Sequence, residues 1–179
     1  RSNGKAYLLD DLAGLISPSD YSEVHLPILE VIFDKLNKIY KIKIDHELNK
    51  MQALPSPSVS FKSFTSAPSG IVSEAPKQVV IEQNDMLNIF NTIIDKRIQE
   101  KVLIAYIYSM VKNSITCEYD LSKVLVLTLV GNQKVHDLQQ VLSFQVLHES
   151  KPLACFLLSL ANYDPLISQM SLDMLRRLN

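Results

Sequence analysis

Four histidines and two cysteines are the side chains of this sequence best suited to metal binding or nucleophilic catalysis. The histidines are scattered along the chain, and no His-Glu-x-x-His or Cys-x-x-Cys spacing brings metal ligands together. Asp45, His46 and Glu47 are adjacent, but consecutive side chains on a helix point in different directions. We therefore interpret this triplet as a solvated helix face.

Cys117 and His136 are a further pair with catalytic potential, because an imidazole can activate a thiol as a nucleophile. No motif surrounds them, and no Gly-x-Ser-x-Gly sequence supplies a serine nucleophile. Glycine-rich phosphate-binding patterns are absent too, in a chain with 4 glycines. The sequence therefore predicts a protein that is not an enzyme, with no catalytic, cofactor or metal site.

Composition narrows the class of protein further. A net charge of −1 gives no electrostatic footprint for nucleic acid or an anionic membrane surface. No apolar run approaches the roughly 18 residues of a membrane span. Two cysteines form no disulfide framework, which favours a reducing, cytoplasmic compartment. We expect Cys155, within an apolar run, to be a small buried side chain.

Three regions separate by composition: a helical segment (1–53), a Pro/Ser-rich linker or long loop (54–80) and a helical core (81–179). In the first, a helix is expected to start near Ser19, and Pro27 either kinks it or opens a new helix in the first turn. It continues to Leu48 or Met51. Its predicted apolar stripe comprises Ile28, Ile32, Leu36 and Ile39, broadened by Leu29, Phe33 and Tyr40.

The second region holds four prolines with serines between them, a composition that disfavours helix and strand. We interpret it as flexible. Docking of Phe61 and Phe64 on a neighbour, or phosphorylation at Ser56, are the alternatives to plain disorder.

The third region reads as consecutive helices with short connections. Asn84 is the expected cap of a first helix that carries Met86 to Ile94, and a second, apolar on most sides, follows from Ile98. Residues 121–130 form a helix capped by Asp120 and ended by Gly131, and residues 135–145 another. Two pairs of a capping residue and a proline open helices at about 152–160 and 165–178: Ser150 with Pro152, and Asp164 with Pro165.

No fixed repeat length is visible, so the expected fold is all-α, an irregular α-solenoid or helical-hairpin array. The helix around Phe156 is apolar all round, which predicts helical layers on both of its sides. Tyr106 and Tyr108 suit core packing better than a partner surface. Leu172 lies off the apolar face of the last helix, so we expect it to meet a partner or further helices.

Two stretches near the end of the chain carry a family resemblance. Residues 148–160, HESKPLACFLLSL, and 171–178, SLDMLRRL, resemble the signature of the Mic domain, the C-terminal helical domain of the Bulli family. Residues 84–111 and 121–147 are similar more loosely. Members of that family have an N-terminal β-propeller, which this chain lacks, and continue with further helices. We therefore expect residues 81–179 to be a Mic-domain core that is incomplete at its C-terminus.

The resemblance implies a cytoplasmic, non-catalytic accessory subunit that binds the Mon/Ccz longin heterodimer, the nucleotide-exchange factor of the late-endosomal Rab GTPase. It implies roles in late-endosome maturation, autophagy and lysosomal trafficking, with peripheral membrane association on late endosomes and lysosomes through the complex. No catalytic residue is carried over. A subunit of a vesicle tether or coat complex is the alternative, because such subunits also contain irregular helical solenoids.

The predicted partner-binding residues lie in the two signature stretches. Lys151, Arg176 and Arg177 form either a small basic patch or ordinary solvated charge. Leu172 joins them as the apolar residue expected on the outer face of the last helix.

Overall fold

The structure, a computed structural model, describes residues 3–16, 25–52 and 79–179. Every regular element within these ranges is an α-helix, which confirms the all-α prediction. In chain order they are α1 (Asn3–Leu15), α2 (His25–Gln52), α3 (Gln83–Thr92), α4 (Lys96–Lys112), α5 (Tyr119–Gly131), α6 (Val135–Ser143), α7 (Lys151–Ser159) and α8 (Pro165–Arg177).

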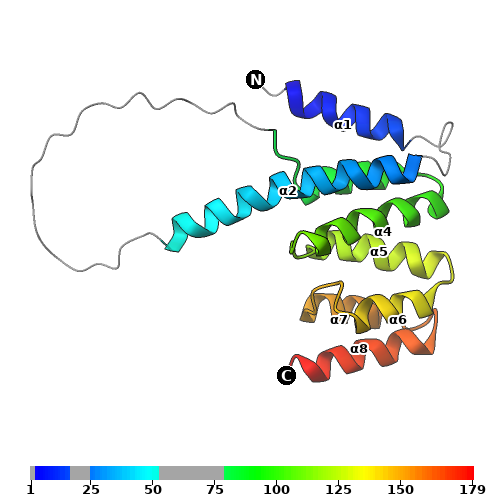
Figure 1. Cartoon of the computed structure of the whole chain (residues 1–179). Helices are drawn as coiled ribbons and strands as arrows, with labels where there is room; N and C mark the ends of the chain where they lie inside the picture. Colours follow the sequence, from blue (N-terminus) through cyan, green and yellow to red (C-terminus); the bar gives the residue numbers. More distant parts are fainter. Residues whose placement is uncertain (1–2, 17–24, 53–78) are drawn as a thin grey trace, which may run out of the picture.

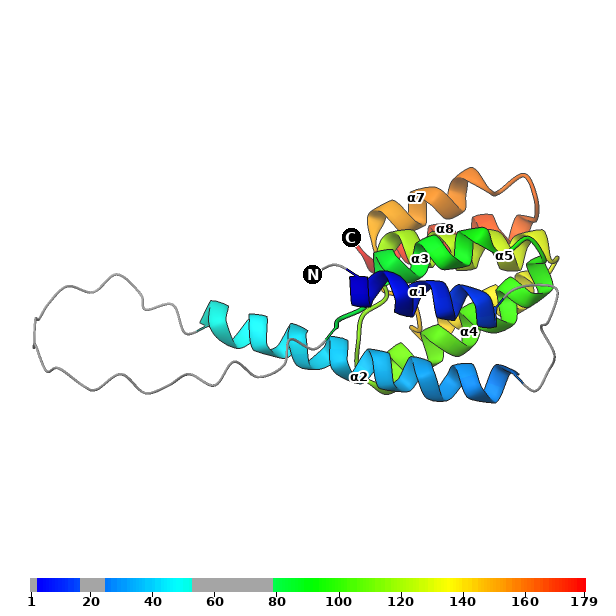
Figure 2. The same cartoon turned by 90° about the horizontal axis from the view of Figure 1, so that it is seen from above.

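The helices stack in one direction, from α1 and α2 at one end to α8 at the other (Figure 1). Helices α1, α3, α5 and α7 are each in contact with the next, while α2 packs on α4 and α6 packs on α8. Seen from above, α7 and α2 lie on opposite sides of the stack (Figure 2). The pairs α4–α5, α5–α6 and α7–α8 form consecutive helical hairpins. This arrangement confirms the predicted helical-hairpin array.

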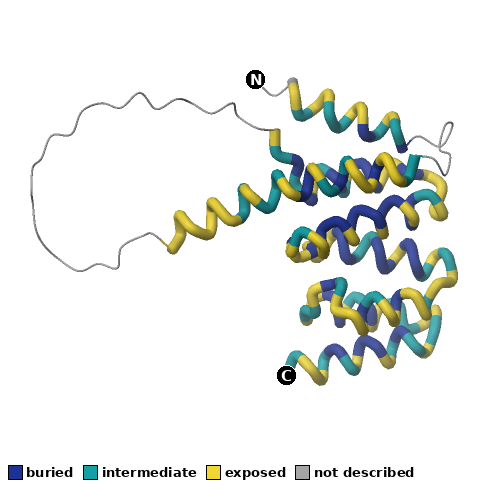
Figure 3. The backbone as a smooth tube through the Cα atoms, viewed as in Figure 1, coloured by how far each residue is buried: buried dark blue, intermediate teal, exposed yellow. Residues whose placement is uncertain are grey.

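The first two helices belong to the same stack as the rest, since α1 contacts α3 and α2 contacts α4. The expected helix start at Ser19 lies outside the described residues, as do residues 54–78 of the expected linker, with Phe61, Phe64 and Ser56. At its far end α2 extends beyond its neighbours, and its side chains there are exposed (Figure 3).

Helix α2 begins just before Pro27, so the proline opens the helix and does not kink it. Its inward face is rotated from the predicted stripe. Leu29 and Phe33 are fully buried, whereas Ile28 is 49% exposed. The reason is Asn37, a polar residue that is buried on the inward face and that a count of apolar positions passes over.

Polar contacts fix the seam between α2 and α4. The Asn37 Nδ2 group donates to Ser109 Oγ across 3.0 Å, and Asn113 Nδ2 donates to Asp34 Oδ1 across 3.1 Å. The two pairs advance in opposite directions along their helices, so α2 and α4 run antiparallel. Lys38 adds an ion pair to Asp34 at 2.8 Å. Asn37 and Ser109 are both buried, and a buried polar group without a hydrogen bond destabilises the fold. The bond between them avoids that cost.

An aromatic cluster lies where α2, α3 and α4 meet. The Tyr106 ring packs edge-on against Phe33, with centroids 5.2 Å apart, and against Phe90 at 5.3 Å. Tyr106 is buried, as predicted, and α4 is buried on most sides (Figure 3). The same prediction for Tyr108 is wrong, because this side chain is 71% exposed. Two residues along a helix correspond to about 200°, so one tyrosine points inward and the other outward.

Buried amides join other helices. Gln99 on α4 donates to a main-chain carbonyl of α3 at 2.8 Å and accepts from Thr128 Oγ1 on α5 at 3.1 Å. Gln83 donates to the Thr116 carbonyl and accepts from the Glu118 amide, both at 2.8 Å. Gln83 thus satisfies main-chain groups in the connection between α4 and α5, and Gln99 a carbonyl near the end of α3.

The predicted N-terminal caps are correct for the two helices whose capping residue is followed closely by a proline, α7 and α8. Ser150 Oγ accepts from the amide three residues on, at 3.3 Å, and Asp164 Oδ1 from the amide two residues on, at 2.8 Å. Both predicted caps are confirmed. Asn84 is not a cap, because α3 starts after Glu82, and Asp120 lies in the first turn of α5 instead of at its cap.

Gly131 does not provide the left-handed turn that ends α5. That conformation is taken by Gln133, at φ 59°, whose amide donates to the Val130 carbonyl, while the Lys134 amide reaches the Leu129 carbonyl at 2.8 Å. These are the two hydrogen bonds of a Schellman motif. The same left-handed conformation follows α4 and α6, at Ser114 and Gln145.

Helix α7 contacts both α5 and α8, so helices from two layers pack on it as expected, but it is not buried all round. Its buried residues are Leu153, Ala154 and Leu157. Phe156 is partly buried, and Leu158 is exposed. Cys155 is exposed too, contrary to the prediction, because it lies on the side of the helix away from its neighbours.

Candidate functional site

The adjacent Asp45, His46 and Glu47 are exposed on the part of α2 that extends beyond its neighbours. Asp45 pairs with Lys41 at 2.9 Å, and Glu47 with Lys43 at 3.8 Å, each one helical turn away. In the described ranges no cluster of three or more histidine, cysteine or carboxylate side chains is arranged to hold a metal ion. The triplet is therefore a solvated helix face, as interpreted from the sequence.

The Cys117 thiol is buried and accepts a hydrogen bond from Ser122 Oγ at 3.4 Å. Burial raises its pKa to about 11, so almost none of it is thiolate near neutral pH. His136 is exposed on α6 and lines a different hollow, together with Tyr163 and Asp164. The two residues do not form a nucleophile–base pair in this fold.

The outer face of α8 presents one of the predicted partner-binding residues clearly. Leu172 is 42% exposed, on the opposite side of the helix from the buried Met170 and Met174. Arg176 lies one turn further on and is exposed, with an ion pair to Asp173 at 3.1 Å. Leu172 and Arg176 thus share one solvent-facing surface.

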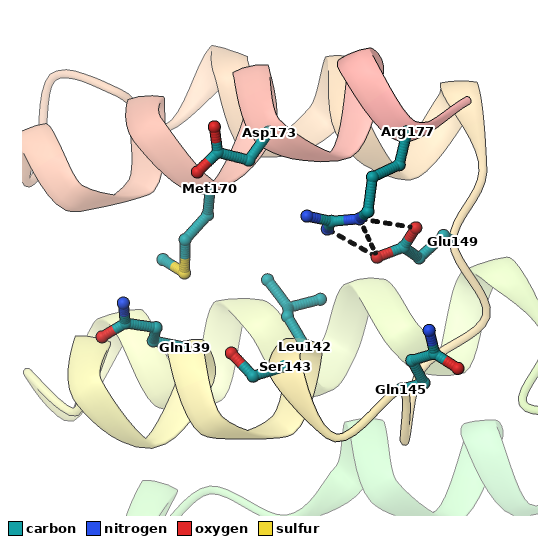
Figure 4. Close-up of a pocket in the computed structure, with 8 residues that line it drawn as sticks. All are labelled: Gln139, Leu142, Ser143, Gln145, Glu149, Met170, Asp173 and Arg177. Carbon is teal, nitrogen blue, oxygen red and sulfur yellow. Dashed lines mark hydrogen bonds and ion pairs between the residues drawn. The ribbon is translucent and has the colours of Figure 1, made fainter. Parts of the chain in front are cut away.

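Arg177 points to a different side, into a hollow of about 330 Å³ between α6 and α8 (Figure 4). Its guanidinium binds Glu149 with two nitrogens: Nε lies 3.0 and 3.1 Å from the two carboxylate oxygens, and Nη2 lies 2.6 Å from Oε1. This pairing raises the pKa of Arg177 and occupies the carboxylate. The rest of the lining is Gln139, Leu142, Ser143, Gln145, Met170 and Asp173.

Lys151 is the first residue of α7 and is exposed, two positions after Glu149. No hydrogen bond or ion pair joins it to another described residue. The four predicted residues therefore lie at two places: Leu172 and Arg176 on the outer face of α8, and Lys151 and Arg177 near the start of α7. The positive charge predicted there is reduced, since a carboxylate neutralises each arginine.

The α7–α8 hairpin holds these residues in a fixed arrangement. Ser171 is buried, and its Oγ donates to the Ala154 carbonyl on α7 at 2.7 Å. The Arg177–Glu149 pair ties the end of α8 to the segment before α7. Sequence reasoning missed two exposed residues of the hairpin, Cys155 and Leu158, because an apolar helix reads as buried.

Comparison with known proteins decides the family. The profile of the family described as "Regulator of MON1-CCZ1 complex, C-terminal" matches residues 1–179, the whole of the chain. The chain belongs to this family. The resemblance of the SKPLAC and SLDML stretches to the regulator subunit is thereby confirmed.

Two curated relatives of the family carry the name Regulator of MON1-CCZ1 complex. The human protein is 31% identical over 185 residues, and the mouse protein is 31% identical over 188 residues. Each alignment covers 100% of this chain and 27% of the relative. The chain thus spans about a quarter of the length of these relatives.

The α7–α8 hairpin exposes apolar side chains on both of its helices. These side chains are Leu172 on α8, and Leu158 and Cys155 on α7. None of the helices in residues 3–16, 25–52 and 79–179 combines the length and the apolar character needed to cross a membrane.

Proposed function

We propose that this chain is a non-catalytic helical scaffold within a regulator of the MON1-CCZ1 complex, and that the α7–α8 hairpin contacts that complex. The observation that carries the proposal is the exposure of Leu172 on the outer face of α8, beside Arg176. A large aliphatic side chain fixed on a rigid helix, with a guanidinium one turn away, suits the centre of a protein interface.

The hairpin acts as one unit because Ser171 and the Arg177–Glu149 pair join its two helices. Docking through such a unit orders few additional groups, so little conformational entropy is lost. The chain changes nucleotide exchange by stabilising or orienting the longin heterodimer of the complex, and it does not touch the nucleotide. That is a coupling between binding sites, in which the bound scaffold favours one state of its partner.

The proposed setting is the cytoplasmic face of late endosomes and lysosomes, which the regulator reaches peripherally through the complex. The late-endosomal Rab GTPase is then an indirect partner, and the roles are endosome maturation, autophagy and lysosomal trafficking. Four residues are proposed to bind the heterodimer: Lys151, Leu172, Arg176 and Arg177.

The test uses the full-length regulator and the purified longin heterodimer, with nucleotide exchange on the Rab measured in the same samples. We expect co-elution with the heterodimer and no exchange by the regulator alone. Leu172→Asp should reduce co-elution strongly, whereas Ile94→Asp, at an exposed site in the α3–α4 connection, should leave it unchanged.

Two results would overturn the proposal. Exchange, or turnover of any nucleotide, by the regulator alone would remove the non-catalytic role. Self-assembly of the regulator, or binding to tether subunits in the absence of the longin heterodimer, would favour a tether or coat subunit instead.

A further inference from the structure

A second surface lies at the other end of the stack, between α2 and α4. There a hollow of about 310 Å³, the α2–α4 groove, has Val31 on one wall and Ala105 and Tyr108 on the other. Val31 is 57% exposed and Tyr108 is 71% exposed. Ile104, one turn before Tyr108, is also exposed and extends the apolar surface along α4. Neighbouring exposed apolar side chains of this size mark interaction sites.

The groove has a positively charged rim. Lys35, Lys38 and Lys112 line it, against the carboxylates of Glu30 and Asp34. Asp34 is already engaged, since Lys38 Nζ lies 2.8 Å and Lys112 Nζ 3.4 Å from its oxygens. Lys35 forms no ion pair with any residue in the described ranges. Three lysines stand against two carboxylates in the lining, so the rim keeps a net positive charge.

The walls of the groove are held in place from below. Asn113 donates to Asp34 and to the Ser109 carbonyl, which keeps the carboxylate at the seam of the two helices. Asn37 and Ser109 bond beside it. The exposed side chains therefore project from a fixed framework, and a partner can bind without reorganising the backbone.

We propose that the α2–α4 groove docks an acidic amphipathic helix of a partner protein. The apolar face of that helix enters the hollow between Val31 and Tyr108, and its carboxylates pair with Lys35 and with the lysines around Asp34. Apolar anchors at helical spacing, flanked by charge opposite to that of the receptor, define this recognition mode. A tyrosine in the centre suits it, because tyrosine is enriched among residues that dominate binding energy.

Two other macromolecules fit less well. Nucleic acid binds mainly through its phosphates and would leave the recessed apolar wall of Val31, Ala105 and Tyr108 without a partner. A flat lipid surface cannot reach Ala105, which is buried at the base of the groove. A protruding helix meets both the recessed apolar wall and the rim.

This surface is separate from the one proposed for the MON1-CCZ1 complex. The α2–α4 groove lies near the first end of the helical stack, and Leu172 lies on α8 at the last end (Figure 1). Substitutions in one surface therefore leave the other intact, and the two proposals fail or succeed independently.

The test is fluorescence anisotropy of the 179-residue chain with a labelled peptide of about four helical turns. The peptide has leucines on one helical face and glutamates on the other. We expect Tyr108→Ala to weaken binding about tenfold or more, the loss typical of a central aromatic. Lys35→Glu should weaken it too, and more so at low salt. Phe144→Ala, an equally exposed aromatic site after α6, should leave affinity unchanged.

Hydrogen exchange on the same complex should show added protection in α2 and α4. Absence of binding would overturn the proposal, as would equal losses in Tyr108→Ala and Phe144→Ala. Equal affinity for a peptide with lysine in place of glutamate would refute the charge argument. Lys35-dependent binding to vesicles containing phosphatidylserine, without peptide binding, would assign the groove to a membrane surface. Thermal unfolding of each variant establishes that the fold is retained.

Discussion

Replacement of Phe33 by alanine tests whether α2 is an integral part of the fold. Phe33 is completely buried and meets Tyr106 edge-on at 5.2 Å. Removing a buried phenyl ring deletes its transfer free energy and leaves a cavity, which together cost about 3–5 kcal/mol. Such a loss is a large fraction of the stability of an ordinary domain, about 5–15 kcal/mol.

Ile28→Ala is the matched control on the same helix. An apolar count places Ile28 and Phe33 on one stripe, but Ile28 is 49% exposed in the structure. Its truncation should change the free energy of unfolding by no more than about 0.5 kcal/mol. A double-mutant cycle of Phe33→Leu with Tyr106→Leu should give a coupling of about 0.5–1.5 kcal/mol for the aromatic pair.

The assay is urea denaturation followed by circular dichroism, with hydrogen exchange resolved by helix. If α2 were only loosely associated, Phe33→Ala would expose the amides of α2 and leave the global midpoint unchanged. Equal costs for Ile28→Ala and Phe33→Ala, or no coupling between Phe33 and Tyr106, would refute the packing described here.

Three further outcomes follow from single side chains. Gln133→Gly should raise the free energy of unfolding by about 0.5–1 kcal/mol, because it removes the strain of a left-handed non-glycine residue. As a control in the same urea titration, Gln139→Gly inside α6 should lower it by about 1 kcal/mol. The pKa of Asp34 is lowered from 3.8 to about 2, mainly by the hydrogen bond that Lys38 donates to it. The ionised carboxylate therefore stabilises the folded chain above about pH 4, and this stabilisation is lost as the pH falls toward 2. The stability gap between the wild type and Asp34→Asn should therefore close over that interval in pH-dependent unfolding, and a constant gap would contradict it. Iodoacetamide should modify the exposed Cys155 quickly and the buried Cys117, with its raised pKa, only when the chain unfolds; mass spectrometry that finds equal rates would contradict its burial.

Local signals in the sequence located several helix boundaries correctly. Ser150 and Asp164 each precede a proline within the first helical turn, and capping depends on atoms only two or three residues away. Residues 121–130 form a helix as predicted despite their β-branched composition, but neither Asp120 nor Gly131 takes the capping position expected of it. Gly131 is in fact inside α5, and the left-handed turn falls two residues later, because the hydrogen bonds of the Schellman motif select the position.

Local sequence patterns do not determine which face of a helix is buried, because that depends on contacts with distant parts of the chain. Asn37 is buried because Ser109 on α4 lies opposite it, and that pairing rotates α2 away from the stripe read from its apolar residues. Gln99 is buried for a comparable reason, through its partners on α3 and α5. Cys155 and Tyr108 are exposed although their neighbours are apolar, since the layers that cover a helix are set by the stacking of distant elements.

The candidate site was predicted in part. The position of Leu172 off the apolar face of the last helix followed from helical periodicity alone. The pairing of Arg177 with Glu149 did not, because 28 residues separate the two in sequence. Arg176 and Arg177, which the sequence allowed to be part of a basic patch or solvated charge, each pair with a carboxylate and point to different sides of α8.

The most direct test of the central proposal is the affinity of the full-length regulator for the MON1-CCZ1 heterodimer. Isothermal titration compares the wild type with two variants, Leu172→Asp and Ile94→Asp. Both side chains are exposed, but Ile94 lies in the connection between α3 and α4, away from the α7–α8 hairpin. We predict that Leu172→Asp weakens binding about tenfold or more while Ile94→Asp binds like the wild type. Equal affinities for the two folded variants would contradict the role of the α8 outer face.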